Sequence, residues 1–251
     1  MALISALSAY ALYRGAKTLN IPNAFLIIPF LVFQTFYFTI SRSALVEPLA
    51  AAIIAFGFFF YTRKKFLYFA LIGSFLPLAR LELSILLVFW AYILYENKQW
   101  KYIFLLAVPT ILWNFAGTLL DGEIFWLYEQ TIGKDVEANR YGHTDFWHYF
   151  QRLIYVIGPI VFYFLVIGLI ERVKNLKSNF FVLGQFIAGF LIYVIFSWKL
   201  NLGQPAGFLR HLISLAPLIA LISLYGFNFW LESVKPARAK SLSPEAKKQN
   251  E

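Results

Sequence analysis

The sequence predicts an all-α protein, a polytopic bundle of transmembrane helices. Three observations support this fold class: the composition, the spacing of the apolar runs and the distribution of charge. Hydrophobic residues make up 60% of the 251 residues and charged residues only 14%, whereas soluble domains are about half apolar and about a quarter charged. One core of this size cannot enclose so much apolar surface, so lipid must solvate much of it.

Apolar runs bounded by charged residues mark about nine candidate spans, judged against the roughly 20 residues that a helix needs to cross a bilayer. The first, fourth and fifth are short. Residues 66–95 could instead form one long helix with Arg80 and Glu82 in its middle. The nine runs lie near 2–13, 21–40, 44–61, 66–79, 83–95, 102–120, 153–170, 180–198 and 211–231.

The distribution of Lys and Arg decides how many spans residues 66–95 contain. With two spans there, one side of the membrane carries 15 of the 22 basic residues and the other side carries 7. With one span, everything downstream changes sides and the bias disappears. Because basic residues favour the cytoplasmic side, we expect two spans and a cytoplasmic C-terminus. The net charge of +9 is then a topology signal, and we expect no nucleic-acid partner.

This topology divides the chain into two parts. Residues 1–232 form the transmembrane domain, whose only long outer loop is 121–152, and membrane lipid is its first partner. Residues 233–251 are rich in Lys, Ala, Ser and Pro, and we expect them to be a basic, disordered cytoplasmic tail. The chain contains no cysteine, which excludes disulfides and thiolate metal sites.

Charged residues at two expected outer corners are the first candidates for a functional site, because charge at membrane depth is costly. Arg80 and Glu82 join two short helices, so the turn should lie inside the protein. There Arg80 could hold a phosphate and Glu82 could orient a sugar hydroxyl or take its proton; a structural Arg–Glu pair is the alternative. Arg42 and Glu47 form the second corner, where an interfacial Arg and a helix-start carboxylate are the alternative.

A third candidate group surrounds a Gly/Pro-rich segment, residues 203–211, that leads into the last helix. Lys199, Arg210 and His211 flank it and could bind the phosphate or pyrophosphate of a lipid. Snorkelling of Lys and Arg to the membrane interface is the alternative.

The long outer loop holds a His-x-Asp-x-x-His pattern at 143–148, with Tyr141 before it. His143 and His148 could ligate a divalent cation, but the spacing is loose and no second cluster supports a metal. Stacking of a sugar on Tyr141 or Trp147, or simple loop packing, fits the pattern better. We therefore expect no resident metal; a divalent cation is the one cofactor that the pattern admits.

Three stretches together resemble the GT-C superfamily of polyprenyl-phosphate-sugar-dependent glycosyltransferases, which includes membrane mannosyltransferases. They are the corner at 41–48 with its Glu-Pro, the Leu-Ala-Arg-Leu-Glu turn at 78–82, and 206–212 followed by Pro217 and Gly226. The turn is similar to the family's Ala-Arg-Pro-Glu, with Leu81 in place of Pro. The resemblance covers about residues 1–231.

The resemblance implies an inverting transfer of sugar from a polyprenyl-phosphate donor to an acceptor on the non-cytoplasmic side. We expect the membrane to be a bacterial inner membrane. The family usually keeps its catalytic Asp in a first outer loop, and this sequence looks like the family without its first helix and loop. Glu82 and Glu47 are then the remaining candidates for the base, and we expect the chain as written to transfer sugar poorly. The alternative is a non-catalytic binder or transporter of lipid-linked sugar.

Overall fold

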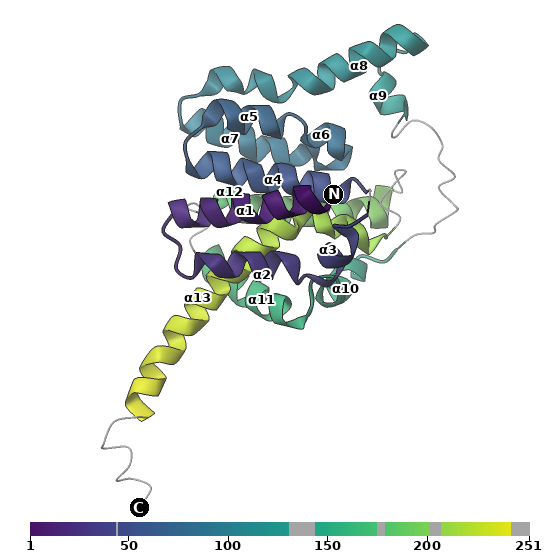
Figure 1. Ribbon diagram of the computed structural model, residues 1–251. Coiled ribbons are helices and arrows are strands. Elements are labelled where there is room, and N and C mark those ends of the chain that lie inside the picture. Colours follow the sequence, from purple (N-terminus) through teal and green to yellow (C-terminus); the bar gives the residue numbers. More distant parts are fainter. Residues whose placement is uncertain (44, 131–143, 175–178, 201–206, 242–251) are drawn as a thin grey trace, which may run out of the picture.

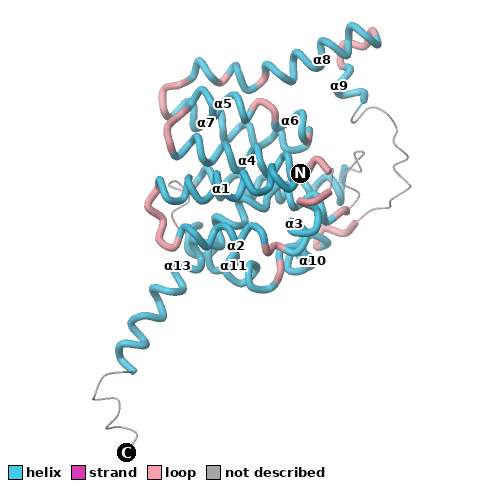
Figure 2. Tube along the Cα trace, viewed as in Figure 1, coloured by secondary structure: helices cyan, strands magenta, loops and turns pink. Residues whose placement is uncertain are grey.

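The computed structural model is helical throughout the part of the chain that it describes, where it contains no β-strand (Figures 1 and 2). The structure describes residues 1–43, 45–130, 144–174, 179–200 and 207–241, and only the backbone of 199–200 and 235–241. The expected all-α class is confirmed. Three helices are long and apolar enough to cross a membrane: Trp100–Asp121, Phe180–Trp198 and Leu209–Val234.

The helices follow the expected apolar runs, but most are shorter than 18 residues. Short 3₁₀ segments join several of them: η1 (Ala24–Leu26), η2 (Leu81–Leu86), η3 (Trp100–Tyr102), η4 (Phe104–Leu106) and η7 (Leu209–Leu215). A π-helical turn, η6 (Phe196–Leu200), ends one of the long helices. The α-helices are α1 (Ala2–Thr18), α2 (Ile27–Val32), α3 (Thr35–Ile40), α4 (Glu47–Thr62), α5 (Phe66–Gly73), α6 (Leu76–Ala79), α7 (Leu87–Glu96), α8 (Val108–Asp121), α9 (Trp126–Tyr128), α10 (His148–Ile157), α11 (Pro159–Val173), α12 (Phe180–Ile195) and α13 (Ala216–Ser241).

The helix is broken within two of the expected spans. The run 21–40 divides into α2 and α3 at Gln34, which is extended (φ −64°, ψ 122°). The run 153–170 divides into α10 and α11 at Gly158, whose positive φ of 81° precedes Pro159. Glycine adopts that conformation without a Cβ clash, and proline starts a helix well because the first turn needs no N–H partner.

The C-terminal segment differs from the disordered tail that the composition suggested. Helix α13 continues to Ser241 and projects beyond the bundle (Figure 1). A preformed helix is extended cheaply by residues of high helix propensity, such as the Ala, Arg and Lys at 237–240. Residues 242–251 lie outside the described residues.

Helix α13 lies at the centre of the packing, and its closest partner is α11. Gly168 of α11 and Gly226 of α13 allow this approach: a Cβ on Gly168 would lie 2.1 Å from the Ile222 carbonyl oxygen, and one on Gly226 would lie 2.0 Å from the Phe164 carbonyl oxygen. Small residues at such crossings are typical of membrane helix pairs.

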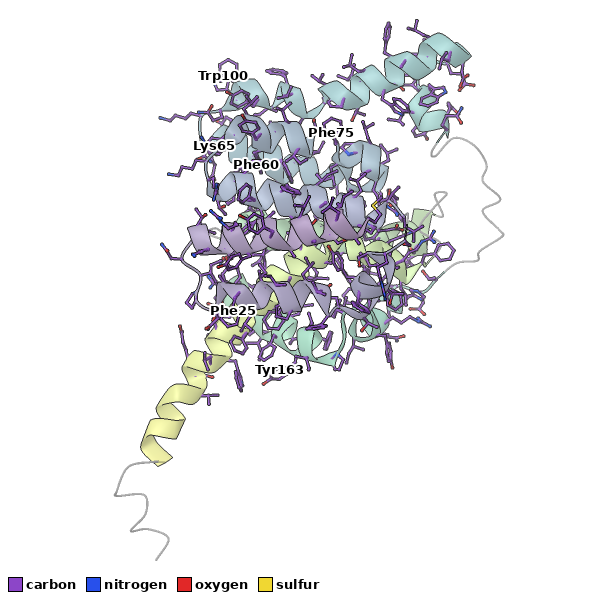
Figure 3. All side chains as sticks on the ribbon, in the orientation of Figure 1. Phe25, Phe60, Lys65, Phe75, Trp100 and Tyr163 are labelled. Carbon is purple, nitrogen blue, oxygen red and sulfur yellow. The ribbon has the colours of Figure 1, made fainter. Side chains whose placement is uncertain are left out.

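Large apolar side chains cover the periphery of the bundle. Phe25, Phe75, Trp100 and Tyr163 all point outward at its edges (Figure 3), and each is about half exposed or more. An aqueous surface rarely carries apolar patches this extensive. The exterior therefore fits contact with lipid.

The bundle has two distinct ends, which correspond to the two ends of helix α4. Residues from the expected outer corners meet at one end, where Glu47 begins α4. The opposite end has two cavities, of about 260 and 370 Å³, which share Leu19 and Tyr225. The first is lined there by Lys64, Asn97 and Asn179. Since α4 has 16 residues, the two ends are separated by about 24 Å at 1.5 Å per residue.

Candidate functional site at the Glu47 end of the bundle

Glu47 is placed by the start of α4. It occupies the first turn of that helix together with Pro48, and its residue is only 1% exposed. Proline is well accommodated there, and the positive end of the helix dipole favours a carboxylate. The Glu-Pro pair thus fixes a buried negative charge at one end of the bundle.

Arg80 is held between α6 and η2 in an extended conformation (φ −153°, ψ 111°). All three of its guanidinium nitrogens have carboxylate partners. Nε and Nη2 lie 2.6 and 2.5 Å from Glu82 Oε1, and Nη1 lies 3.0 Å from Glu47 Oε1. Arg80 is therefore a bridge between the two acids, and the expected inward location of the Arg80–Glu82 turn is what the structure has.

Arg210 and His211 of η7 approach the same carboxylate from the other side. Arg210 Nε lies 3.3 Å from Glu47 Oε1, and His211 Nε2 lies 3.8 Å from it. His211 is buried, whereas the Arg210 side chain is 40% exposed and its guanidinium lies over the Phe208 ring, 4.9 Å from the centroid. The last-helix motif and both carboxylates thus meet in one cluster.

Hydroxyl groups surround this charged cluster, and the sequence analysis did not single them out. Tyr193 of α12 and Ser214 of η7 are fully buried. The Tyr193 ring centroid lies 5.9 Å from that of His211. Tyr149 of α10 accepts a hydrogen bond of 3.2 Å from Ser197 Oγ. In the sequence, each of them has the helical spacing of an ordinary core residue, so no sequence signal singled them out.

The charges of the cluster balance. The guanidiniums of Arg80 and Arg210 offset the carboxylates of Glu47 and Glu82. Burial lowers the pKa of Arg80, but Tyr193 and the Glu82 and Glu47 carboxylates outweigh it and raise that pKa above its ordinary value. Burial also raises the pKa of Tyr149, so this phenol is neutral at physiological pH.

Of the loop candidates, His148 lies beside the cluster. His148 Nδ1 accepts from Arg152 Nη1 at 2.8 Å, so its Nε2 carries the proton and donates to the Gly207 carbonyl oxygen at 2.9 Å. These two bonds occupy both ring nitrogens. Thr144 Oγ1 lies 3.4 Å from the Ser197 carbonyl oxygen. The start of α10 is thereby fastened to the segment that leads into η7.

Other expected site residues lie elsewhere. Arg42 is exposed, stacks on the Phe38 ring at 4.5 Å from its centroid and makes no hydrogen bond or ion pair with Glu47. Tyr141 and His143 lie outside the described residues, as does the side chain of Lys199. Within the described part of the chain, no three His, Asp or Glu side chains are grouped as metal ligands would be.

An apolar groove of about 520 Å³ adjoins the turn between Arg80 and Glu82, because Leu81 is one of its lining residues. Helix α8 forms one wall through Ile111 and Phe115, and the following segment adds Phe125 and Tyr128. The groove therefore connects the lipid-facing helix α8 with the rim of the charged cluster.

No protein-family model, no curated protein and no solved structure matches this chain. The functional argument consequently rests on the residues of the cluster and on their geometry.

Proposed function

We propose that the chain is a membrane glycosyltransferase, or a part of one, that takes its sugar from a polyprenyl-phosphate donor on the non-cytoplasmic side. One observation supports this most directly: a buried carboxylate, Glu47, is shared by two arginines and lies at the end of the bundle where the expected outer corners meet. Burying a charge at membrane depth costs free energy, so a charge found there is a candidate for a functional role.

Arg210 is the best phosphate ligand of the cluster. Its side chain is 40% exposed, and its Nε lies 3.3 Å from Glu47 Oε1. In this proposal its Nη groups donate to a phosphate oxygen in a bidentate contact. Arg80 has all its nitrogens committed to carboxylates, so its proposed role is to position Glu47 and Glu82.

In this proposal, the groove beside Leu81 binds the hydrocarbon chain of the donor. It is largely apolar, it borders lipid-facing α8, and it ends next to the turn that carries Arg80 and Glu82. A lipid whose tail lies in the groove would bring its head group to the cluster.

The experiment measures binding of a radiolabelled polyprenyl-phosphate sugar to purified protein. Arg210→Gln should weaken binding about tenfold to a hundredfold, the usual value of a charged hydrogen bond. Arg63→Gln is the matched control, because Arg63 follows α4 at the opposite end of the bundle and lies over the Phe59 ring. Equal binding by wild type and Arg210→Gln would refute the assignment.

A second function, non-catalytic binding or transport of a lipid-linked sugar, is favoured by one feature of the cluster. Both carboxylates accept bonds from guanidinium groups, which is the arrangement of a structural ion pair. Sugar transfer to an acceptor in the same preparation separates the two functions. Binding without turnover would favour the alternative, and turnover that Glu82→Gln or Glu47→Gln abolishes would establish the enzyme. A bacterial inner membrane is the proposed location.

A further inference from the structure

Besides Arg210 Nε, which lies 3.3 Å from Glu47 Oε1 as an ion pair, four buried polar atoms around Glu47 have no hydrogen-bond partner in the described structure: Glu47 Oε2, the Tyr193 hydroxyl, the Ser214 hydroxyl and His211 Nδ1. Each of the four residues is at most 1% exposed. They come from three elements, α4, α12 and η7. The Tyr193 and Ser214 hydroxyls are near enough to interact as hydrogen-bonding side chains, but neither meets full hydrogen-bond geometry with a described protein group.

We propose that these four atoms form a subsite that recognises the hydroxyl groups of the sugar ring. This inference rests on the proposed function and assigns two residues to it, Tyr193 and Ser214, that carry no charge. The buried side of Glu47 would face the sugar, and the Arg210 side would face the phosphate.

The chemistry of the four atoms favours hydroxyl groups over a phosphate. A carboxylate oxygen only accepts hydrogen bonds, so Glu47 Oε2 needs a donor, and a phosphodiester has none. The Tyr193 and Ser214 hydroxyls can donate or accept. Neighbouring sugar hydroxyls can do both as well, so one ring can satisfy all these groups together.

The burial of these atoms makes their lack of partners unusual. More than nine in ten buried polar groups in proteins have a partner, and each exception calls for an explanation. Five of the ten exceptions among the described residues lie around one carboxylate, Glu47. Because the Tyr193 hydroxyl completes no hydrogen bond with a described group, a purely structural tyrosine at this site would lose little by becoming phenylalanine.

The test compares the affinity of the purified protein for polyprenyl-phosphate mannose, polyprenyl-phosphate glucose and the sugar-free polyprenyl phosphate. In wild type at least one sugar-bearing lipid should bind roughly tenfold more tightly than the sugar-free lipid. Tyr193→Phe and Ser214→Ala should each remove most of that ratio, since one hydrogen bond accounts for about two- to tenfold. Binding of the sugar-free lipid, which depends on Arg210, should stay within about twofold.

Tyr37→Phe is the matched control. Tyr37 of α3 is also buried and also has a hydroxyl without a hydrogen-bond partner, but it interacts with Ser5 and Ser8 and not with this cluster. It should keep the wild-type ratio. Thermal unfolding of each variant shows that it is folded, and the two separate substitutions guard against a failure of either one.

Two results would overturn the inference, and they are distinguishable. If the sugar-bearing lipids keep their advantage in both Tyr193→Phe and Ser214→Ala, or if wild type has no such advantage, the hydroxyl subsite is refuted while phosphate binding at Arg210 stands. If wild type binds none of the three lipids, the proposed function fails and the subsite fails with it.

Discussion

The Glu47 carboxylate and the Arg80 guanidinium lie 3.0 Å apart, although 33 residues separate them in the chain. Their side chains are only 2% and 7% exposed. Because Arg80 also binds Glu82 and Glu47 also faces Arg210, this contact joins the start of α4 to the turn before η2 and to η7. Three segments that are distant in sequence are thereby held at one end of the bundle.

Removing the cation from this contact should destabilise the protein strongly. Arg80→Met leaves the two carboxylates without their main partner, and breaking a buried ion pair in this way costs about 3–5 kcal/mol. Thermal unfolding in detergent measures the loss. Arg14→Met, which removes a half-buried arginine whose side chain bonds the Tyr10 hydroxyl in an exposed hydrogen bond, should change the midpoint little.

A double variant tests whether the cost comes from uncompensated charge. Arg80→Met combined with Glu47→Gln should be less destabilised than the sum of the two single variants, because it removes one carboxylate that the first change leaves unpaired. Strict additivity would show that the two residues contribute independently and that the 3.0 Å contact adds nothing to the free energy of unfolding.

The helical class was predictable because lipid imposes it on a chain of this composition. The backbone must satisfy its own hydrogen bonds in a bilayer, so apolar runs between charges become helices. The number of helices that cross was less predictable. The length of a run does not show breaks such as those at Gln34 and Gly158, and three helices meet the length and apolarity needed to cross.

The charged part of the site was predictable from sequence, and the uncharged part was not. Charges inside apolar runs are conspicuous, so Glu47, Arg80, Glu82 and Arg210 could be named. Tyr193 looks like any aromatic residue of an apolar helix. Its place beside His211 depends on how α12 packs against η7, which local sequence does not encode.

Trp90 offers a prediction about the packing of the core. It is fully buried, donates through Nε1 to Gln185 Oε1 at 2.7 Å and stacks on Phe69 at 4.4 Å between ring centroids. Gly57 and Gly73 make room for it, because a Cβ on either would lie 2.0–2.2 Å from the indole.

Trp90→Phe should therefore destabilise the protein by about 2–4 kcal/mol, through the space it leaves and the unpaired Gln185 oxygen. Trp100→Phe is the control, because Trp100 is 63% exposed at the start of η3, and it should have little effect. Equal midpoints for the two variants in thermal unfolding would contradict this view of the core.

The contact between α11 and α13 gives a fourth prediction. Gly168→Ala and Gly226→Ala would each place a methyl group about 2 Å from a carbonyl oxygen of the partner helix. Backbone cannot move aside as a flexible side chain can, so each change should cost more than the roughly 1–3 kcal/mol of ordinary overpacking. Ile170→Ala, on the exposed face of α11, should be tolerated in the same unfolding assay.

The last prediction concerns which end of the bundle faces the cytoplasm. Asp145 lies at the Glu47 end, next to the segment that bonds Ser197, and Lys98 and Lys174 follow α7 and α11 at the other end. All three residues are exposed. The 15 to 7 division of basic residues predicts that Asp145 is outside the cell membrane and that both lysines are inside.

The chain lacks cysteine, so a single introduced cysteine can be labelled without background reaction at other positions of the chain. In intact cells, a membrane-impermeant maleimide should label the Asp145→Cys variant and neither Lys98→Cys nor Lys174→Cys. All three should be labelled after permeabilisation, which shows that each thiol is reactive. The reverse pattern would place the Glu47 cluster in the cytoplasm and remove the outer-side donor from the proposal. Labelling of only one of the two lysine positions in intact cells would show that the ends of α7 and α11 face different sides.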